Sequence, residues 1–163
     1  MVTAAGCSAS KPRRGSTANF LGDEATPGSP IWAEDPGAYI VAIPNGEELP
    51  REAVGTVPPL LVLSPVCSND QRRVGWCLST QRFVCPQCRT VFGVTGAVES
   101  GPAPRGLDRL RATANATTGE LTADSANPGR GPTRSDDTPN RTAAKSDAKC
   151  PVLRFPEDPS LAT

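Results

Sequence analysis

The sequence predicts a small antiparallel all-β domain, and three observations carry this prediction. Short β-branched or aromatic runs recur between residues 38 and 124, separated by turn-forming segments such as PNGEELP and SND. The 18 prolines and 15 glycines favour turns and leave little room for helices. Because only 4% of the residues are aromatic, we expect one modest core of roughly 90 residues, not a core that fills the chain.

The expected strands follow one another at short intervals along the chain. They are AYIVAI (38–43), LLVLS (60–64), RRVGW (72–76), RFVC (82–85), TVFGV (90–94), AVES (97–100) and TTGELTAD (117–124). This spacing indicates a small sandwich or barrel, with the domain spanning residues 37–128. Residues 1–36 are rich in Gly, Ser, Pro and Ala, and residues 129–163 have little to bury, so we expect both segments to be disordered.

Composition and charge argue against several classes of function. Seventeen basic and seventeen acidic residues give a net charge of zero, so we expect no nucleic-acid partner. No apolar run reaches the roughly 20 residues of a membrane-spanning helix, and no segment reads as a secretion signal. The chain contains no histidine, which excludes Ser-His and Cys-His nucleophile pairs. We therefore expect that the protein is not an enzyme.

Four of the six cysteines lie between residues 67 and 88, at intervals of nine, seven and two residues. Of these, only CPQC (85–88) has the C-x-x-C spacing of a zinc knuckle. The spacing leaves open a structural zinc site on Cys67, Cys77, Cys85 and Cys88, a turn whose thiols bind nothing, and a set of disulfides whose pairing the sequence does not reveal.

The residues around these cysteines carry a more specific signal. The run VCSNDQRRVGW, followed by RFVCPQCRTVFGVTGAVESGPAPRGLDRL, resembles the Rieske iron-sulfur domain of bacterial cytochrome bc-type complexes. That family carries a C-x-H-x-G-C box, a C-P-C-H-G-S box and a G-P-A-P loop. Cys67 matches the start of the first box, Cys85 and Pro86 the start of the second, and residues 101–104 the proline loop. The likeness covers residues 38–128 and implies a Rieske-like fold in which loops 67–72 and 85–90 meet at one end.

The two boxes depart from the family at the positions that hold its cofactor. In the family, two cysteines and two histidines bind a 2Fe-2S cluster, and a disulfide joins the two loops. Asn69 and Cys88 stand at the histidine positions, and Arg72 and Gln87 at the disulfide positions. Gln71 and Arg89 replace glycines, so we expect backbone strain wherever the loops require positive φ.

These departures imply a Rieske-like protein that no longer binds a Rieske cluster or transfers electrons. Because the amide of Asn69 is a poor iron ligand, no intact cofactor site is expected at Cys67, Asn69, Cys85 and Cys88. Two alternatives stay open: a remodelled iron-sulfur electron carrier ligated by Cys67, Cys85 and Cys88 with Cys77 as the fourth ligand, or structural zinc on the same cysteines. By resemblance, the partners are cytochrome b- and c-type subunits of a membrane-associated complex.

Overall fold

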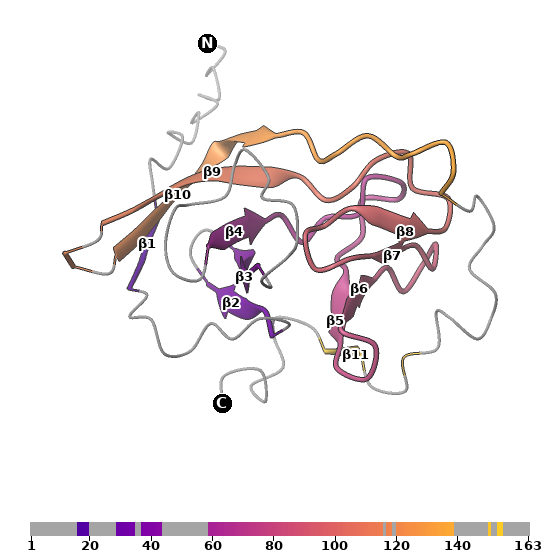
Figure 1. The fold of residues 1–163 in the computed structure, drawn as a ribbon, viewed down its shortest axis with the longest axis horizontal. Coiled ribbons are helices and arrows are strands. Elements are labelled where there is room, and N and C mark those ends of the chain that lie inside the picture. Colours follow the sequence, from indigo (N-terminus) through magenta and orange to yellow (C-terminus); the bar gives the residue numbers. More distant parts are fainter. Residues whose placement is uncertain are drawn as a thin grey trace, which may run out of the picture.

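The protein is described by a computed structural model covering residues 16–19, 29–34, 37–43, 59–115, 117–118, 120–138, 150 and 153–154. These residues form two antiparallel sheets and no helix, so the predicted all-β antiparallel class is confirmed. The larger sheet has the order β1-β10-β9-β4-β3-β2, and the smaller has the order β11-β5-β6-β7-β8 (Figure 1). Within the described ranges, no helix could cross a membrane.

The larger sheet is built around two strands that are buried throughout. Its members are β1 (Ser16–Asn19), β2 (Ile31–Ala33), β3 (Ala38–Ala42), β4 (Leu60–Leu63), β9 (Arg109–Ala114) and β10 (Glu120–Gly129). In β3, Tyr39 and Val41 face the core shared with the smaller sheet, whereas Ile40 packs in a second core with Leu110 and Leu121. Because both faces are covered, β3 and β4 read as continuous apolar runs instead of alternating patterns.

The smaller sheet contains β5 (Gly75–Cys77), β6 (Arg82–Val84), β7 (Val91–Phe92), β8 (Val98–Ser100) and β11 (Leu153–Arg154). Aromatic contacts join it to the larger sheet. The ring of Phe83 lies 4.7 Å from that of Trp76 and 4.9 Å from that of Tyr39, centroid to centroid. The Tyr39 hydroxyl also donates a hydrogen bond to the Val74 carbonyl oxygen at 3.1 Å. These contacts fix the smaller sheet, and the loops that leave it, against the core.

The described chain differs from the sequence expectation at several places. Strands β1, β2, β9 and β11 were not expected, and β1 and β2 lie in the segment 1–36 that was expected to be disordered. Strand β5 begins at Gly75 instead of residue 72 because Arg72 and Arg73 belong to an exposed connection. Residues 129–138, assigned from the sequence to the tail, lie against the domain, where the Gly106 amide donates to the Pro132 carbonyl oxygen at 2.8 Å. The expectations for residues 1–15, 20–28, 35–36, 139–149, 151–152 and 155–163 fall outside the described residues.

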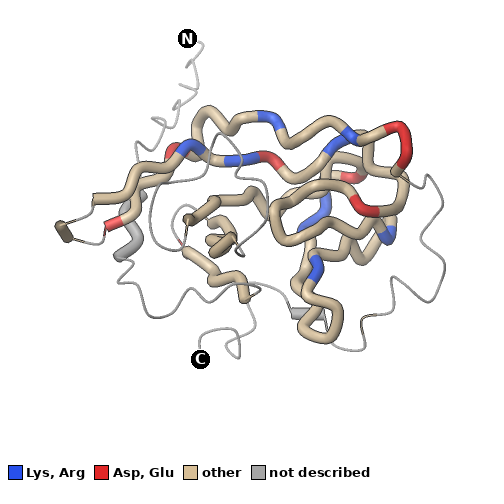
Figure 2. Tube along the Cα trace, in the orientation of Figure 1, with Lys and Arg blue, Asp and Glu red and all other residues tan. Residues whose placement is uncertain are grey.

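Charges of both signs are interspersed along the described chain (Figure 2). Arg111 of β9 lies opposite Asp124 of β10 in the strand register, and Arg82 pairs with Glu99 at 2.6 Å. This distribution matches the net charge of zero.

Candidate metal centre

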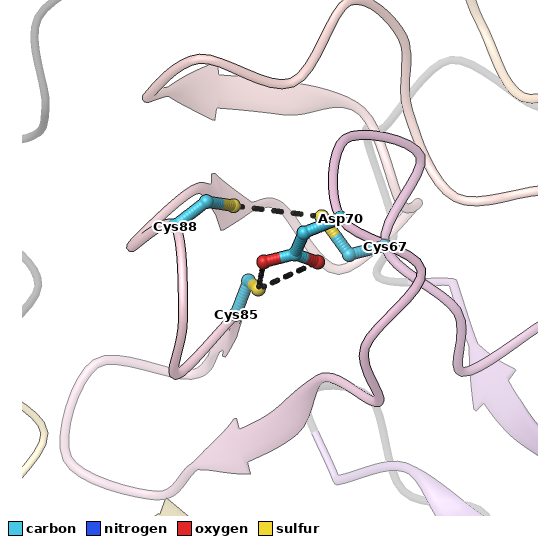
Figure 3. A group of neighbouring side chains, drawn as sticks. All are labelled: Cys67, Asp70, Cys85 and Cys88. Atoms are coloured by element: carbon cyan, nitrogen blue, oxygen red, sulfur yellow. Dashed lines mark hydrogen bonds between the residues drawn. The ribbon is translucent and has the colours of Figure 1, made fainter.

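Two loops, residues 67–72 between β4 and β5 and residues 85–90 between β6 and β7, converge on one point. Each supplies two donor side chains, Cys67 and Asp70 from the first loop and Cys85 and Cys88 from the second (Figure 3). The ligand atoms of all four residues lie within 4.8 Å of one another. The prediction that these loops meet is confirmed.

The two loops share one backbone design. In each loop, the amide four residues after the first cysteine donates to that cysteine's carbonyl oxygen, at 3.0 Å from Gln71 to Cys67 and 2.9 Å from Arg89 to Cys85. The cysteine's own amide donates to the carbonyl oxygen of the residue five places on, at 2.8 Å and 2.9 Å. The segments CSND and CPQC are therefore equivalent tight turns, and Asp70 occupies in the first turn the place that Cys88 has in the second.

Both turns place a non-glycine residue in the left-handed region. The φ angle is 59° at Gln71 and 58° at Arg89. An L-residue in this conformation brings Cβ close to the following carbonyl oxygen, at a cost of about 1–2 kcal/mol. The positive φ at which strain was expected is therefore present at both Gln71 and Arg89.

The donor atoms form two pairs, and both pairs run between the two loops. The Sγ atoms of Cys67 and Cys88 are 3.6 Å apart, and Cys85 Sγ lies 3.2 Å and 3.4 Å from the carboxylate oxygens of Asp70. Cys67 and Cys85 are fully buried, whereas Asp70 and Cys88 are half-buried. The cluster therefore has a sulfur-rich interior and one edge near solvent.

Thr90 supports the cluster from the second loop. It is buried, and its Oγ1 lies 3.1 Å from Cys88 Sγ while accepting a hydrogen bond from the Ala103 amide at 3.2 Å. If Cys88 is a thiolate, the Thr90 hydroxyl is the donor in this pair, because a thiolate can only accept. Thr90 would then stabilise the charged form of the sulfur.

The proline loop, residues 101–105, contacts both cysteine loops. It reaches the second loop through the Ala103 amide and the first loop through the Arg105 carbonyl oxygen, which accepts from Ser68 Oγ at 2.6 Å. Gly101 has a φ of 102°, and a Cβ built there would lie 2.5 Å from Thr90 Cα. Only glycine tolerates this close contact with the Thr90 backbone, which explains why the GPAP segment begins with glycine.

The cluster shifts the acidities of its own groups. A hydrogen bond with Cys67, together with burial, raises the pKa of the Cys85 thiol, and burial raises the pKa of Cys88. Burial also acts to raise the pKa of Asp70, but the Arg72 amide and the thiols that donate to the carboxylate outweigh it and hold that pKa below its ordinary value. Without metal, these shifts favour neutral thiols at Cys85 and Cys88 beside an ionised Asp70 carboxylate.

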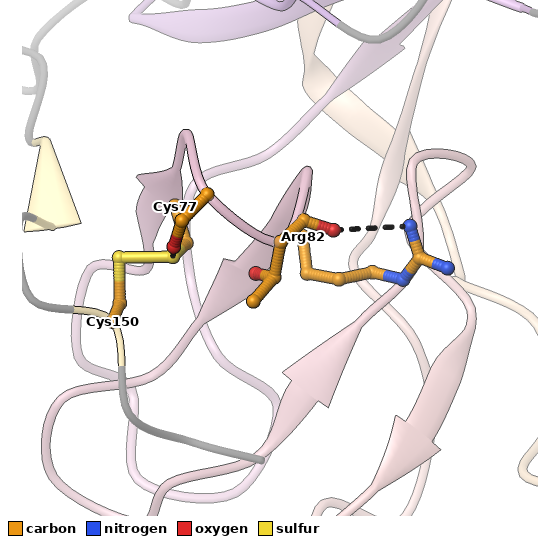
Figure 4. Close-up of a disulfide and its surroundings, with 5 residues drawn as sticks. Cys77, Arg82 and Cys150 are labelled. Atoms are coloured by element: carbon orange, nitrogen blue, oxygen red, sulfur yellow. Dashed lines mark hydrogen bonds between the residues drawn. A yellow bond between two sulfur atoms is a disulfide. The ribbon is translucent and has the colours of Figure 1, made fainter. Parts of the chain in front are cut away.

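The structure corrects the expectation for Cys77. Its sulfur is bonded to Cys150, 73 residues away in the sequence (Figure 4). A sulfur in a disulfide is not a thiolate, so Cys77 cannot be the fourth metal ligand in this state. The bond ties the Cys150 segment to β5, where β11 pairs as the edge strand.

Asp70 takes the place expected for a fourth ligand, and sequence reasoning missed it. Asn69, the residue at the family's histidine position, is exposed and is not among the four donors. Arg72 and Gln87 are exposed as well. The available signal was the C-x-x-D spacing of residues 67–70, which repeats the C-x-x-C spacing of residues 85–88.

Comparisons with known proteins give one structural match to report. No family model and no curated protein matches the sequence. Among solved structures, the chain is similar to the cyanobacterial plasma membrane Rieske protein PetC3 from Synechocystis PCC 6803, with 20% sequence identity and a TM-score of 0.42. The match covers 59% of this chain and 84% of that one.

Proposed function

We propose that the protein is a β domain with Rieske-like sequence boxes whose two cysteine loops hold a single tetrahedral zinc ion. The proposal rests on one observation. Two equivalent turns each supply two donors, which make three thiols and one carboxylate in all, and the four donor atoms lie within 4.8 Å of one another. Paired turns that each present two ligands are the usual frame of structural zinc sites. Asp70 supplies the second ligand of the turn that the cysteine spacing alone leaves incomplete.

The separations between donor atoms support a single ion. Zinc bonds of about 2.3 Å to sulfur, at tetrahedral angles, place two sulfurs about 3.8 Å apart, and a sulfur and an oxygen about 3.5 Å apart. The Cys67 to Cys88 separation is 3.6 Å, and Cys85 Sγ is 3.2 Å and 3.4 Å from the Asp70 oxygens. These two pairs lie within a few tenths of an ångström of the tetrahedral values, and all the other pairs lie within 4.8 Å, so shifts of up to about 1 Å would complete the site.

The donor set does not suit the 2Fe-2S cluster that the sequence resemblance implies. That cluster needs two ligand pairs directed at two different irons, and in the Rieske type one pair is histidine. Here the four donors face one point, and the chain has no histidine. We infer that the domain does not pass electrons to cytochrome subunits.

A structural role follows from the closed ligand set. Four protein ligands leave no position for water or substrate, which is the arrangement of structural and not catalytic zinc. The ion would cross-link loops 67–72 and 85–90, which carry Arg72 and Gln87 where the family has a disulfide. We therefore propose a metal-stabilised binding or scaffold domain without catalytic activity.

Metal analysis and absorption spectroscopy test the proposal. Protein produced without oxygen in medium containing both zinc and iron should be colourless and carry one zinc per chain. Replacement by Co²⁺ should give thiolate-to-cobalt charge-transfer bands and the intense d–d bands of tetrahedral cobalt. The variant Cys88→Ser should lose most of this binding, whereas Gln87→Ser, an exposed change in the same turn, should keep it.

Two outcomes would replace the proposal. Sulfide-to-iron charge-transfer bands would identify the remodelled iron-sulfur carrier. A folded protein that contains no metal and takes up neither Zn²⁺ nor Co²⁺ would identify a scaffold with an inactive site.

A further inference from the structure

Cys67 and Cys88 are free thiols in direct contact across the two loops. Their Sγ atoms are 3.6 Å apart, whereas the thiol of Cys85 is directed at Asp70. We propose that Cys67 and Cys88 form an oxidisable dithiol, which a hydroperoxide converts into a disulfide with release of the metal. The release rests on the proposed function; the formation of the disulfide does not.

The burial of the thiols sets the order of reaction. Cys88 is half-buried, whereas Cys67 and Cys85 are fully buried. A small oxidant therefore reaches Cys88 first, and Cys67 is the neighbouring sulfur placed to react with the product. Closing a bond of about 2.05 Å from the present separation requires the two sulfurs to approach by about 1.5 Å, within the range of side-chain rotation.

Disulfide formation takes two steps and reduces one peroxide. The Cys88 sulfur, as a thiolate that has lost its proton or its metal, attacks one oxygen of hydrogen peroxide, the O–O bond breaks, and hydroxide leaves and takes a proton to form water. The Cys67 thiolate then attacks the sulfur of the Cys88 sulfenic acid, the S–O bond breaks, and a second hydroxide leaves and is protonated. In sum, two thiolates, one peroxide and two protons give one disulfide and two waters, with the thiolates oxidised by two electrons.

The disulfide would empty the metal site. It consumes two of the four donors and leaves Cys85 and Asp70, which are too few to hold a tetrahedral ion. It also joins loop 67–72 to loop 85–90, so the two loops remain cross-linked after the metal has gone. The site would thus exchange a metal cross-link for a covalent one when it meets peroxide.

The main competitor is a disulfide within the C-x-x-C turn, between Cys85 and Cys88. The structure favours Cys67 because its sulfur contacts Cys88, while Cys85 donates to the Asp70 carboxylate. Peptide mapping distinguishes the two pairings.

The test treats zinc-loaded protein with hydrogen peroxide, follows zinc release with a chromogenic chelator, and maps disulfides by mass spectrometry. We expect one Cys67 to Cys88 link for each zinc released, with Cys85 still free and the Cys77 to Cys150 link unchanged. Dithiothreitol with added zinc should restore binding. The variant Cys85→Ser should still form the link, and Cys88→Ser should not.

The same treatment of metal-free protein separates this inference from the proposed function. If the chain binds no metal but forms the Cys67 to Cys88 link, the dithiol stands and its coupling to metal release fails. If zinc binds and peroxide produces a Cys85 to Cys88 link, a Cys67 to Cys85 link, a sulfinic acid at Cys88, or zinc loss with all thiols intact, the inference is overturned and the metal site stands.

Discussion

Gln71 and Arg89 occupy equivalent positions in the two turns of the candidate metal site. Each follows the first cysteine of its turn by four residues, each donates its amide to that cysteine's carbonyl oxygen, and the φ angles are 59° and 58°. The equivalence makes Asp70 the counterpart of Cys88, although the two segments have only their first residue in common. The four donors of the candidate site are thus positioned by two turns of the same geometry.

This strain predicts that Gln71→Gly and Arg89→Gly each stabilise the metal-free protein by about 1 kcal/mol. Glycine removes the cost of about 1–2 kcal/mol that a residue with a Cβ pays in the left-handed region. Its greater conformational freedom in the unfolded chain cancels part of this gain. Urea unfolding measures the difference. Arg89→Ala is the control, because alanine keeps the Cβ and should give no gain; an equal gain from alanine would attribute the effect to the lost arginine side chain.

Thr90→Val should weaken zinc binding by about tenfold. The substitution keeps the shape of the side chain but removes the hydroxyl beside Cys88 Sγ, and the loss of a hydrogen bond to a metal ligand typically costs 10- to 100-fold in affinity. Chelator competition measures the affinity, and circular dichroism verifies the fold. Thr80→Val, at an exposed turn position, should leave binding unchanged; unchanged binding in both variants would show that Thr90 does not act on the sulfur.

Gly101→Ala should destabilise the domain by about 2–4 kcal/mol, since the new Cβ combines an unfavourable φ with overlap of the Thr90 backbone. Gly93→Ala is the matched control. There the added Cβ meets only the flexible end of the Glu99 side chain, at 2.7 Å from Oε1, so a loss below about 1 kcal/mol is expected. Thermal unfolding compares the two, and equal losses would contradict the close approach at Gly101.

The metal-free protein should lose stability at alkaline pH. The pKa values of Cys85 and Cys88 are raised above the ordinary thiol value of 9.0, so the unfolded chain releases these protons at a lower pH than the folded one. Their contribution to stability is therefore complete below pH 9 and is lost as the pH rises above it. Urea midpoints between pH 7 and 11 should show this decline.

Two comparisons isolate the thiols in this pH dependence. In zinc-loaded protein, Cys85 and Cys88 should not contribute to the loss of stability at alkaline pH, because the metal has already displaced their protons. Metal-free Cys85→Ser and Cys88→Ser should each show a shallower decline. The same slope in all four samples would assign the effect to other groups.

Much of the fold could be predicted because its strands are buried on both faces or bounded by clear turns. AYIVA and LLVL became β3 and β4, and the two boxes became loops that meet. Strand β9 was missed because the segment RLRATA carries two arginines and buries little besides Leu110. This segment is a strand because it pairs with β4 and β10, and such pairing cannot be read from the local sequence pattern.

The sequence predicted the three cysteines of the candidate site but not its fourth donor, Asp70. The family pattern directs attention to Asn69, one residue before the side chain that faces the sulfurs. Cys77 was misplaced because its partner, Cys150, lies 73 residues further along the chain, and sequence spacing does not report contacts at that range.

The coordination of zinc at Asp70 tests the central claim most directly. X-ray absorption at the zinc edge of the loaded protein should show three sulfurs at about 2.3 Å and one oxygen at about 2.0 Å, and the variant Asp70→Cys should show four sulfurs with zinc retained. A wild-type shell of four sulfurs, or a shell that Asp70→Cys leaves unchanged, would contradict the account, because Asp70 would then not be the fourth ligand of the ion.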